Sequence, residues 1–419
     1  MQKTPTLDFV YFDAGGGHRS AAIALESVIA SEGYGWKVRL INLQDVLDPL
    51  DIFRKVTRIR LQDIYNRMLA RGWTLGSPYL LPMMQAVIRL YHRPSVKLLS
   101  RYWQERQPDM VVSLVPNLNR ALFESLQRAS PAIPFVTILT DFADYPPHFW
   151  IEKQKEYFIC GTERAVEQAK DLGHEASRVF RTSGMILRPQ FYRTPALDRS
   201  EERKRLGLDA DLPTGLVLFG GEGSNVMFSI AERLGNAALV LQLIMICGKN
   251  AKLRDRLKAL RTRNTLVVVG FTKEIPYYMQ MSDFFIGKPG PGSISEALHM
   301  NLPVIVECNA WTLPQERYNA HWVAEQGVGV VLRNFRDIEA AVKALLAGDG
   351  LARMQKRVAA IDNRAVFEIP PILAQLLKEH CALTAGSKCE LTREFPANGA
   401  SDIAGSVRAG LADTDCARS

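Results

Sequence analysis

The stretch LDFVYFDAGGGHRSAAIAL, Leu7 to Leu25, has the pattern of a buried strand, a glycine loop and a helix. Apolar residues fill most of Leu7–Phe12, three glycines follow, and an alanine-rich helical pattern extends from about Ser20 to Ser31. An apolar strand followed at once by a helix is typical of a parallel sheet that is covered on both faces. The stretch therefore predicts an α/β protein.

Apolar runs alternate with helical patterns along most of the remaining chain. A first series comprises Lys37–Leu43, Met110–Leu114, Phe135–Leu139, Tyr157–Cys160 and Val179–Thr182, and a second comprises Leu216–Phe219, Leu241–Cys247, Leu266–Val269, Phe284–Ile286, Val304–Val306 and Val328–Leu332. Two such series predict two doubly wound, Rossmann-like domains. We expect them over residues 1–190 and 191–350, joined near Arg188–Arg199, where two prolines interrupt the pattern.

The C-terminal part differs in composition from the two predicted domains. Residues 351–380 have a helical pattern that Pro370 and Pro371 are expected to break. Residues 381–419 are rich in Ala, Gly, Ser and Thr and poor in large apolar side chains. We expect this last segment to be a disordered tail, because it has too little apolar surface to bury.

Composition narrows the class of protein. The 419 residues carry a formal net charge of +8, which favours an anionic partner such as nucleic acid, a phosphorylated substrate or a membrane surface. No apolar run is long enough for a membrane-spanning helix, and the N-terminus does not have the pattern of a signal peptide. The six cysteines form no CxxC pair, so neither a zinc site nor a disulfide framework is indicated. We expect a cytoplasmic protein.

The glycine loop after the first strand is a candidate binding site. Gly15, Gly16 and Gly17 allow close approach of a ligand to the backbone, and the following helix start presents unpaired N–H groups. His18 is then placed at the carboxyl edge of the sheet, where open α/β sheets bind ligands. The spacing fits neither a dinucleotide fingerprint nor a P-loop. A tight turn with an exposed histidine is the alternative.

The second predicted domain begins in the same way. In VLFGGEGSN, Val217 to Asn225, a strand enters a second glycine loop that contains Gly221 and Ser224. Two such loops, one in each domain, are expected to face each other across a cleft.

The segment GKPGPGSISEAL, Gly287 to Leu298, carries the strongest signal for an anionic ligand. Gly290, Gly292 and Ser293 leave N–H groups free at a predicted helix start, where a phosphate binds well. Glu296 lies one turn further on, and its carboxylate can accept two hydroxyl hydrogen bonds, as from a ribose diol. A favourable helix-dipole charge is the alternative role for Glu296 alone.

The segment LPQERYNA, Leu313 to Ala320, adds a second polar turn at a predicted helix start. It contributes Gln315, Glu316 and Asn319. Amide and carboxylate side chains together suit a ligand that is rich in hydroxyl groups, such as a sugar.

These motifs together resemble the monogalactosyldiacylglycerol synthase and processive diacylglycerol glucosyltransferase family. The chain is more distantly similar to the N-acetylglucosaminyltransferase of peptidoglycan lipid synthesis. The resemblance covers roughly Leu7 to Ile369 and rests on DAGGGHRSAAIAL, YFICGTERAVEQAKDLGHEASRVFRTSGMILRPQF, GGEGS, ICGKN, GFTKEIPYYMQMSDFFIGKPGPGSISEAL and PQERYNA, in the family's order.

The resemblance implies a GT-B glycosyltransferase, with two Rossmann-like domains facing across a cleft that holds a UDP-sugar. Such an enzyme inverts the anomeric centre and needs no metal or other cofactor. Residues 1–190 would bind the acceptor and the membrane, residues 191–350 would bind the donor, and the helix over 351–380 would cross back to the first domain.

The resemblance also implies roles for individual residues in the cleft. The donor set is Gly221 and Ser224 in the second loop, Phe271 at the uracil, Glu296 at the ribose, Gly290, Gly292 and Ser293 at the diphosphate with Asn319 nearby, and Gln315 and Glu316 at the sugar. His18 would be the base on the acceptor hydroxyl, and Gly15, Gly16 and Gly17 would admit the acceptor. Asp141, in TDFADYPPHFW, would contact the acceptor or support the base, although His148 is shifted in register from the family's histidine.

A basic and apolar segment is expected to bind the membrane. Phe53–Trp103 holds ten Lys and Arg residues and one acid, interleaved with aromatic and aliphatic side chains. This composition suits an interface on anionic lipid, whereas the alternative is a helical insertion with a solvated basic face. We expect a peripheral protein on the inner face of the cell membrane.

We therefore predict a transferase that moves a hexose from a UDP-sugar to a membrane lipid hydroxyl, with diacylglycerol as the first candidate. Another lipid or a polyprenyl acceptor is the first alternative, and a UDP-sugar 2-epimerase or hydrolase of the same fold is the second. No nucleic-acid-binding motif accompanies the basic charge, so no nucleic acid partner is expected. The identity of the sugar stays open.

Overall fold

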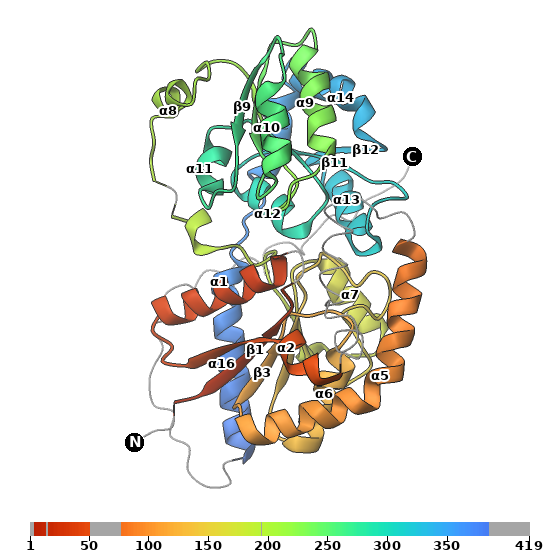
Figure 1. The fold of residues 1–419 in the computed structure, drawn as a ribbon. Coiled ribbons are helices and arrows are strands. Elements are labelled where there is room, and N and C mark those ends of the chain that lie inside the picture. The colour runs from red at the N-terminus through yellow and green to blue at the C-terminus, as the bar shows by residue number, and fades with distance from the viewer. Residues whose placement is uncertain (1–3, 14–15, 51–76, 194, 385–419) are drawn as a thin grey trace, which may run out of the picture.

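The computed structural model describes residues 4–13, 16–50, 77–193 and 195–384. The described chain forms two lobes, each built on a six-stranded parallel sheet (Figure 1). The predicted disordered tail falls on residues 381–419, of which 385–419 lie outside the described residues and 381–384 belong to the last helix.

The first sheet has the strand order β2-β1-β3-β4-β5-β6. Its strands are β1 (Thr6–Tyr11), β2 (Lys37–Asn42), β3 (Met110–Ser113), β4 (Phe135–Ile138), β5 (Tyr157–Cys160) and β6 (Val179–Arg181). Helices α1 (Gly17–Ser31) and α16 (Ala365–Thr384) bury their apolar sides against one face. Helices α5 (Ser77–Arg106) and α6 (Asn119–Ala129) cover the other, with the short α2 (Leu43–Leu47) at the edge, and α7 (Glu163–Asp171) packs beside β5.

The second sheet has the strand order β12-β11-β10-β7-β8-β9. Its strands are β7 (Thr214–Leu218), β8 (Gln242–Ile246), β9 (Thr265–Val269), β10 (Phe284–Gly287), β11 (Val304–Glu307) and β12 (Gly329–Leu332). One face is covered by α9 (Val226–Asn236), α10 (Ala251–Ala259) and α14 (Ile338–Leu346), and the other by α11 (Ile275–Gln280), α12 (Pro291–His299) and α13 (Pro314–Gln326).

All the predicted strands are confirmed within two residues. The inner strands, such as β3, β4, β7 and β10, are short apolar runs with every residue buried, whereas the edge strands β2, β6, β9 and β12 are partly exposed. In each sheet the first strand lies between two neighbours that follow it in the chain, which creates a switch point in the strand order. Ligands of open α/β sheets bind beyond the carboxyl ends of strands at this point. Both glycine loops, after β1 and after β7, lie there.

The C-terminal helices show one departure from the prediction. The break in residues 351–380 is not at Pro370 and Pro371, which lie inside α16, but at residues 359–364, after α15 (Gly350–Val358). Asn363 starts α16 by accepting a hydrogen bond from the Ala365 N–H. The helix continues through both prolines because Ile369 and the leucines that follow are buried against the first sheet.

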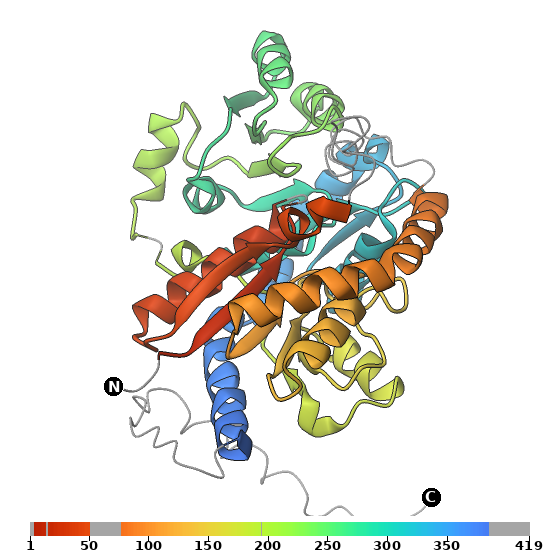
Figure 2. The same ribbon diagram turned by 60° about the horizontal axis from the view of Figure 1, so that its bottom comes forward.

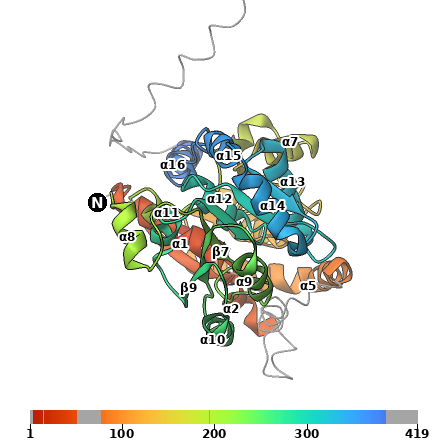
Figure 3. The same cartoon turned by 90° about the horizontal axis from the view of Figure 1, so that it is seen from above.

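The two lobes meet through the loops at the carboxyl ends of their strands. Figure 1 shows α12 and α13 on the side of the second lobe that faces the first, and α16 running through the first lobe. Turned views show α5 along the outside of the first lobe (Figure 2) and extending past the edge of the second (Figure 3).

Candidate active site

The glycine loop after β1 starts α1 without a side-chain cap. Gly16 takes the cap position with φ of 79°, a left-handed conformation that favours glycine. Its carbonyl accepts a hydrogen bond from Ser20 N at 3.0 Å. Gly16 and Gly17 are exposed, and a side chain at either would meet open space. Gly15 lies outside the described residues.

His18 lies in the first turn of α1, against the loop that follows β4. Its Nδ1 is 2.9 Å from Thr140 Oγ1, and its ring centre is 5.7 Å from the ring of Trp150. Burial lowers the pKa of His18 to about 4, although the Leu114 carbonyl favours the protonated ring. The imidazole is therefore neutral near pH 7 and able to accept a proton.

Asp141 follows Thr140 in the same loop and is only 6% exposed. Trp150 Nε1 donates a hydrogen bond of 2.9 Å to Asp141 Oδ2. Burial raises the pKa of Asp141 to about 7; the Trp150 hydrogen bond opposes this rise and the nearby Glu316 adds to it. One buried indole therefore contacts both residues that were predicted for the acceptor side.

The loop that carries Asp141 also packs against α13 of the second lobe. The rings of Phe142 and Trp322 are 4.7 Å apart, and those of Tyr145 and Tyr318 are 5.3 Å apart. These contacts join the loop to the helix that presents Gln315 and Glu316. The two halves of the predicted site are thus brought together at the interface between the lobes.

The donor side is built around the start of α12. Gly290 is the cap residue and Pro291 the first helical residue, so no side chain caps the helix and its first N–H groups face the loop. A side chain at Gly292 would meet nothing within 4 Å, which leaves room for a ligand. Asn319 is fully buried, and its Nδ2 donates to the Pro289 carbonyl at 3.0 Å. Asn319 therefore fixes the turn between β10 and α12 from within the protein core.

Lys288 and Glu316 form an ion pair beside this helix start. Lys288 Nζ is 2.8 Å from Glu316 Oε1, and Glu316 is 8% exposed. Gln315 is half-buried in the first turn of α13, the helix that also carries Glu316. The charges of Lys288 and Glu316 both act on the pKa of Asp141, so the three groups lie near one another where the lobes meet.

Glu296 is paired with Arg188, which lies just before the short 3-10 helix η3 (Pro189–Phe191) between the lobes. Arg188 Nη2 is 3.3 Å from Glu296 Oε1. Burial raises the pKa of Glu296, and Arg188 opposes the rise. A carboxylate in this position is available as an acceptor only while its charge is balanced.

The second glycine loop is held by the backbone of the loop after β8. Gly221 is exposed, and its carbonyl accepts from Lys249 N at 2.8 Å. Gly223 has φ of 63°, and a side chain there would come within 2.6 Å of the Cys247 carbonyl. Ser224 Oγ accepts from Val226 N at 3.4 Å. Phe271, predicted at the uracil, is 60% exposed after β9.

Four further residues belong to the site and were not singled out from the sequence. They are Thr140 and Trp150 beside His18 and Asp141, and Arg188 and Lys288 beside the donor carboxylates. Lys288 had a signal, because it stands between a strand end and a glycine turn. Arg188 and Trp150 lay inside quoted motifs, but nothing in the sequence indicated their partners.

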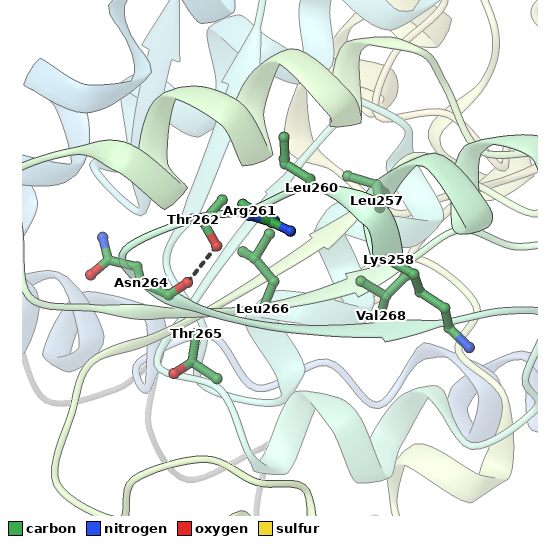
Figure 4. Close-up of a pocket in the computed structure, with 9 residues that line it drawn as sticks. All are labelled: Leu257, Lys258, Leu260, Arg261, Thr262, Asn264, Thr265, Leu266 and Val268. Atoms are coloured by element: carbon green, nitrogen blue, oxygen red, sulfur yellow. Dashed lines mark hydrogen bonds between the residues drawn. The ribbon is translucent and has the colours of Figure 1, made fainter.

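A separate surface pocket lies between α10 and β9, away from these residues. Figure 4 shows it lined by Leu257, Lys258, Leu260, Arg261, Thr262, Asn264, Thr265, Leu266 and Val268. Thr262 donates to the Asn264 carbonyl at 2.8 Å, and the Asn264 amide donates to two backbone carbonyls. These hydrogen bonds hold the loop that lines the pocket. The pocket contains none of the candidate site residues, so it is not part of the candidate site.

The described residues contain no group of three or more His, Cys, Asp or Glu side chains arranged to hold a metal ion. Among the described helices, none combines the length and the apolarity needed to cross a bilayer.

Comparison with known proteins places the two halves in related families. Residues 18–185 match the family described as monogalactosyldiacylglycerol (MGDG) synthase. Residues 216–361 match the glycosyltransferase family 28 C-terminal domain.

Individual relatives agree with this assignment. A probable chloroplastic monogalactosyldiacylglycerol synthase 2 of Oryza sativa subsp. japonica is 30% identical over 342 residues, which span 78% of this chain and 70% of the relative. The chloroplastic synthase of Spinacia oleracea is 30% identical over 348 residues, or 79% of this chain and 64% of that protein.

Solved structures confirm the fold. The UDP complex of S. aureus MnaA superposes with a TM-score of 0.59 at 16% identity, covering 90% of this chain and 97% of that chain. Acinetobacter baumannii MurG gives 0.57 at 13% identity, covering 90% and 100%. With two parallel six-stranded sheets joined at their loops, the fold is GT-B. The chain belongs to the monogalactosyldiacylglycerol synthase family and is a glycosyltransferase of glycolipid synthesis.

Proposed function

We propose that this protein transfers a hexose from a UDP-sugar to the free hydroxyl of diacylglycerol, with inversion at the anomeric carbon and without a metal. The observation that carries the proposal is the contact where the lobes join, in which Phe142, next to Asp141, packs on Trp322 of the helix that presents Gln315 and Glu316. That contact brings the Asp141 carboxyl and the Trp150 indole of one lobe to the side of the other lobe that carries the predicted sugar-binding turn. The names of the related monogalactosyldiacylglycerol synthases support diacylglycerol as acceptor and galactose as sugar.

The donor nucleotide binds the second lobe. The free N–H groups at the start of α12, around Gly292 and Ser293, receive the diphosphate, and Glu296 accepts hydroxyl hydrogen bonds from the ribose. Phe271 offers an exposed ring to the uracil, and the loop with Gly221 and Ser224 contributes from beside Lys288, where Gly220 lies. Asn319 acts through the Pro289 carbonyl, not by touching the ligand.

Lys288 supports departure of the diphosphate. When the donor binds, its ammonium turns from Glu316 to a phosphate oxygen, where negative charge grows as the glycosidic bond breaks. Glu316 and Gln315 are then available to accept hydrogen bonds from the hydroxyls of the hexose. A cation and helix amides together replace the metal that other nucleotide-sugar enzymes use.

The acceptor binds the first lobe, beside the glycines before α1. His18, neutral because burial lowers its pKa to about 4, takes the proton of the lipid hydroxyl as that oxygen attacks the anomeric carbon. The ionised Asp141 stabilises the imidazolium that forms. Trp150 holds both side chains in place.

The protein reaches its lipid as a peripheral protein on an anionic membrane surface. On α5, Arg89, Arg93, Lys97 and Arg101 are all exposed at four-residue spacing, so they form one basic stripe. Leu90 beside the stripe is 76% exposed. A basic stripe with exposed apolar groups suits anionic lipid. The rest of the predicted membrane segment, residues 53–76, lies outside the described residues.

The proposal is tested with purified protein, a panel of UDP-hexoses and diacylglycerol in vesicles, with products read by mass spectrometry. The expected product is a monohexosyl diacylglycerol. His18→Ala should lower turnover by about 100-fold or more and leave UDP affinity within a few fold. Equal losses in turnover and UDP affinity would contradict the base assignment. Conversion of UDP-sugar without any acceptor would favour the epimerase or hydrolase alternative.

A further inference from the structure

The residue before η3 contacts the candidate ribose-binding carboxylate from outside the donor lobe. Arg188 and Glu296 are 108 positions apart in the chain, yet Arg188 Nη2 donates to Glu296 Oε1 at 3.3 Å. The side chains are 29% and 18% exposed, so both are largely shielded from water. A pair at this depth interacts more strongly than one on an open surface.

Arg188 itself is held in a fixed position. Its guanidinium lies 5.2 Å over the ring of Phe191, which is 1% exposed and belongs to the core under α12. Pro189 follows it and restricts the backbone. The Arg188 Nε is buried without a hydrogen-bond partner in the described structure. Holding the side chain in this position therefore costs desolvation free energy.

Glu296 needs this partner in order to act on a diol. A carboxylate accepts hydrogen bonds at both oxygens, whereas a protonated carboxyl uses one oxygen as a donor. Burial raises the pKa of Glu296, and Arg188 is the cation that opposes the rise. We propose that Arg188 is a positioning residue of the donor site, which holds the Glu296 carboxylate ionised and oriented for the two hydroxyls of the ribose. The inference rests on the proposed function, since it takes Glu296 as the ribose contact.

The other titratable groups near Glu296 do not substitute for Arg188. His299 lies one turn further along α12, and burial lowers its pKa, so it is neutral near pH 7. Asp362 and Arg364 act on the pKa of His299 in opposite directions. Removing the guanidinium therefore leaves Glu296 without a facing cation, and the buried carboxyl takes up a proton instead.

The test compares the affinity for UDP with the affinity for an analogue that lacks one ribose hydroxyl. The ratio of the two affinities measures recognition of the diol. Dissociation constants for UDP and for 2′-deoxy-UDP are measured by calorimetry in wild type, Arg188→Met, Arg188→Lys and Glu296→Gln. In wild type we expect UDP to bind roughly 10- to 100-fold more tightly than the deoxy analogue, the effect of one hydrogen bond to a charged group. In Arg188→Met and Glu296→Gln the ratio should fall to within about threefold of one.

Three comparisons separate a positioning role from the alternatives. The ratio is expected to recover in Arg188→Met as the pH is raised, because Glu296 then ionises; the two nucleotides share the same phosphates, so phosphate titration cancels. Arg188→Lys should keep most of the discrimination. Combining Arg188→Met with Glu296→Gln should add no further loss. The matched control is Arg193→Met, an exposed arginine of the same segment, whose ratio should equal that of wild type.

The outcomes distinguish the inference from the function on which it rests. If wild type discriminates but Arg188→Met weakens both nucleotides equally, Arg188 binds phosphate directly and the inference is overturned while the donor site stands. If wild type binds UDP without discrimination, the ribose role of Glu296 fails, and the inference fails with it. If wild type does not bind UDP, the proposed function itself fails.

Discussion

Asp141→Asn should remove a pH dependence of turnover that the structure assigns to this one carboxyl. Burial raises the pKa of Asp141 to about 7 and lowers the pKa of His18 to about 4. Asparagine keeps the size of the side chain and an oxygen to accept from Trp150 Nε1, so the loop should stay in place. What it removes is the charge that, in the proposed mechanism, stabilises the imidazolium of His18.

The expected size of the effect follows from the two pKa values. A carboxyl with a pKa of about 7 is roughly one-tenth ionised at pH 6 and nine-tenths at pH 8. If the ionised form is required, the wild-type kcat should rise about tenfold across that interval. His18 contributes no rise there, because a group with a pKa of about 4 is already about 99% neutral at pH 6.

The assay is the initial rate of glycolipid formation at saturating donor and acceptor between pH 5.5 and 8.5. Asp141→Asn is expected to give a kcat that is lower by about 100-fold at pH 8 and flat over the range. Asp171→Asn, the same change on the exposed end of α7, is the control and should keep the wild-type profile. A flat wild-type profile, or a rise that survives in Asp141→Asn, would refute the assignment.

Three further changes test other parts of the structure. Lys288→Met should lower kcat by roughly 100-fold, with partial recovery in Lys288→Arg, because a donor to the leaving diphosphate is lost; a loss of UDP-sugar affinity alone would contradict this. Glu156 is buried, and no cation among the described residues acts on it. Burial raises its pKa well above the usual value, so the folded state loses stability as the pH rises and Glu156 ionises. Glu156→Gln should therefore gain stability over wild type by up to about 1.4 kcal/mol per pH unit above pH 4.5, measured by denaturant unfolding at pH 6 and 8. Replacing Arg93 and Lys97 together by Gln should weaken binding to anionic vesicles by roughly 30-fold and leave binding to neutral vesicles unchanged.

The fold could be predicted in detail because its signal is local. Each strand is a short apolar run, and each site loop is a glycine-rich turn between a strand and a helix, so the twelve strands and the places of His18 and Gly290 follow from reading the chain in order. The terminal helix shows the limit of this approach. Two consecutive prolines predict a break, but burial of Ile369 and its neighbours against the first sheet outweighs the lost hydrogen bonds.

The charge pairing of the site could not be predicted from the sequence. Arg188 meets Glu296 across 108 positions and Lys288 meets Glu316 across 28. In the sequence, Arg188 is a single arginine before a proline and cannot be distinguished from an ordinary surface cation. Its pairing with the buried Glu296 carboxylate is visible only in the folded structure. In the same way, the raised pKa of Asp141 depends on burial between two lobes that only the tertiary structure supplies.

These pairs bear on how the proposed donor would bind. Arg188 with Glu296 and Lys288 with Glu316 each form a charge-balanced pair, so these four side chains offer little excess positive charge to a nucleotide diphosphate. The attraction must then come from the N–H groups at the start of α12 and from transfer of Lys288 to the phosphates. That transfer leaves Glu316 buried without its cation unless hydroxyl groups of the hexose hydrogen-bond to it. The intact UDP-sugar satisfies both groups at once, whereas UDP after transfer satisfies only Lys288. In the proposed mechanism, return of Lys288 to Glu316 would therefore favour release of UDP, so the same ion pair would act in both donor binding and product release.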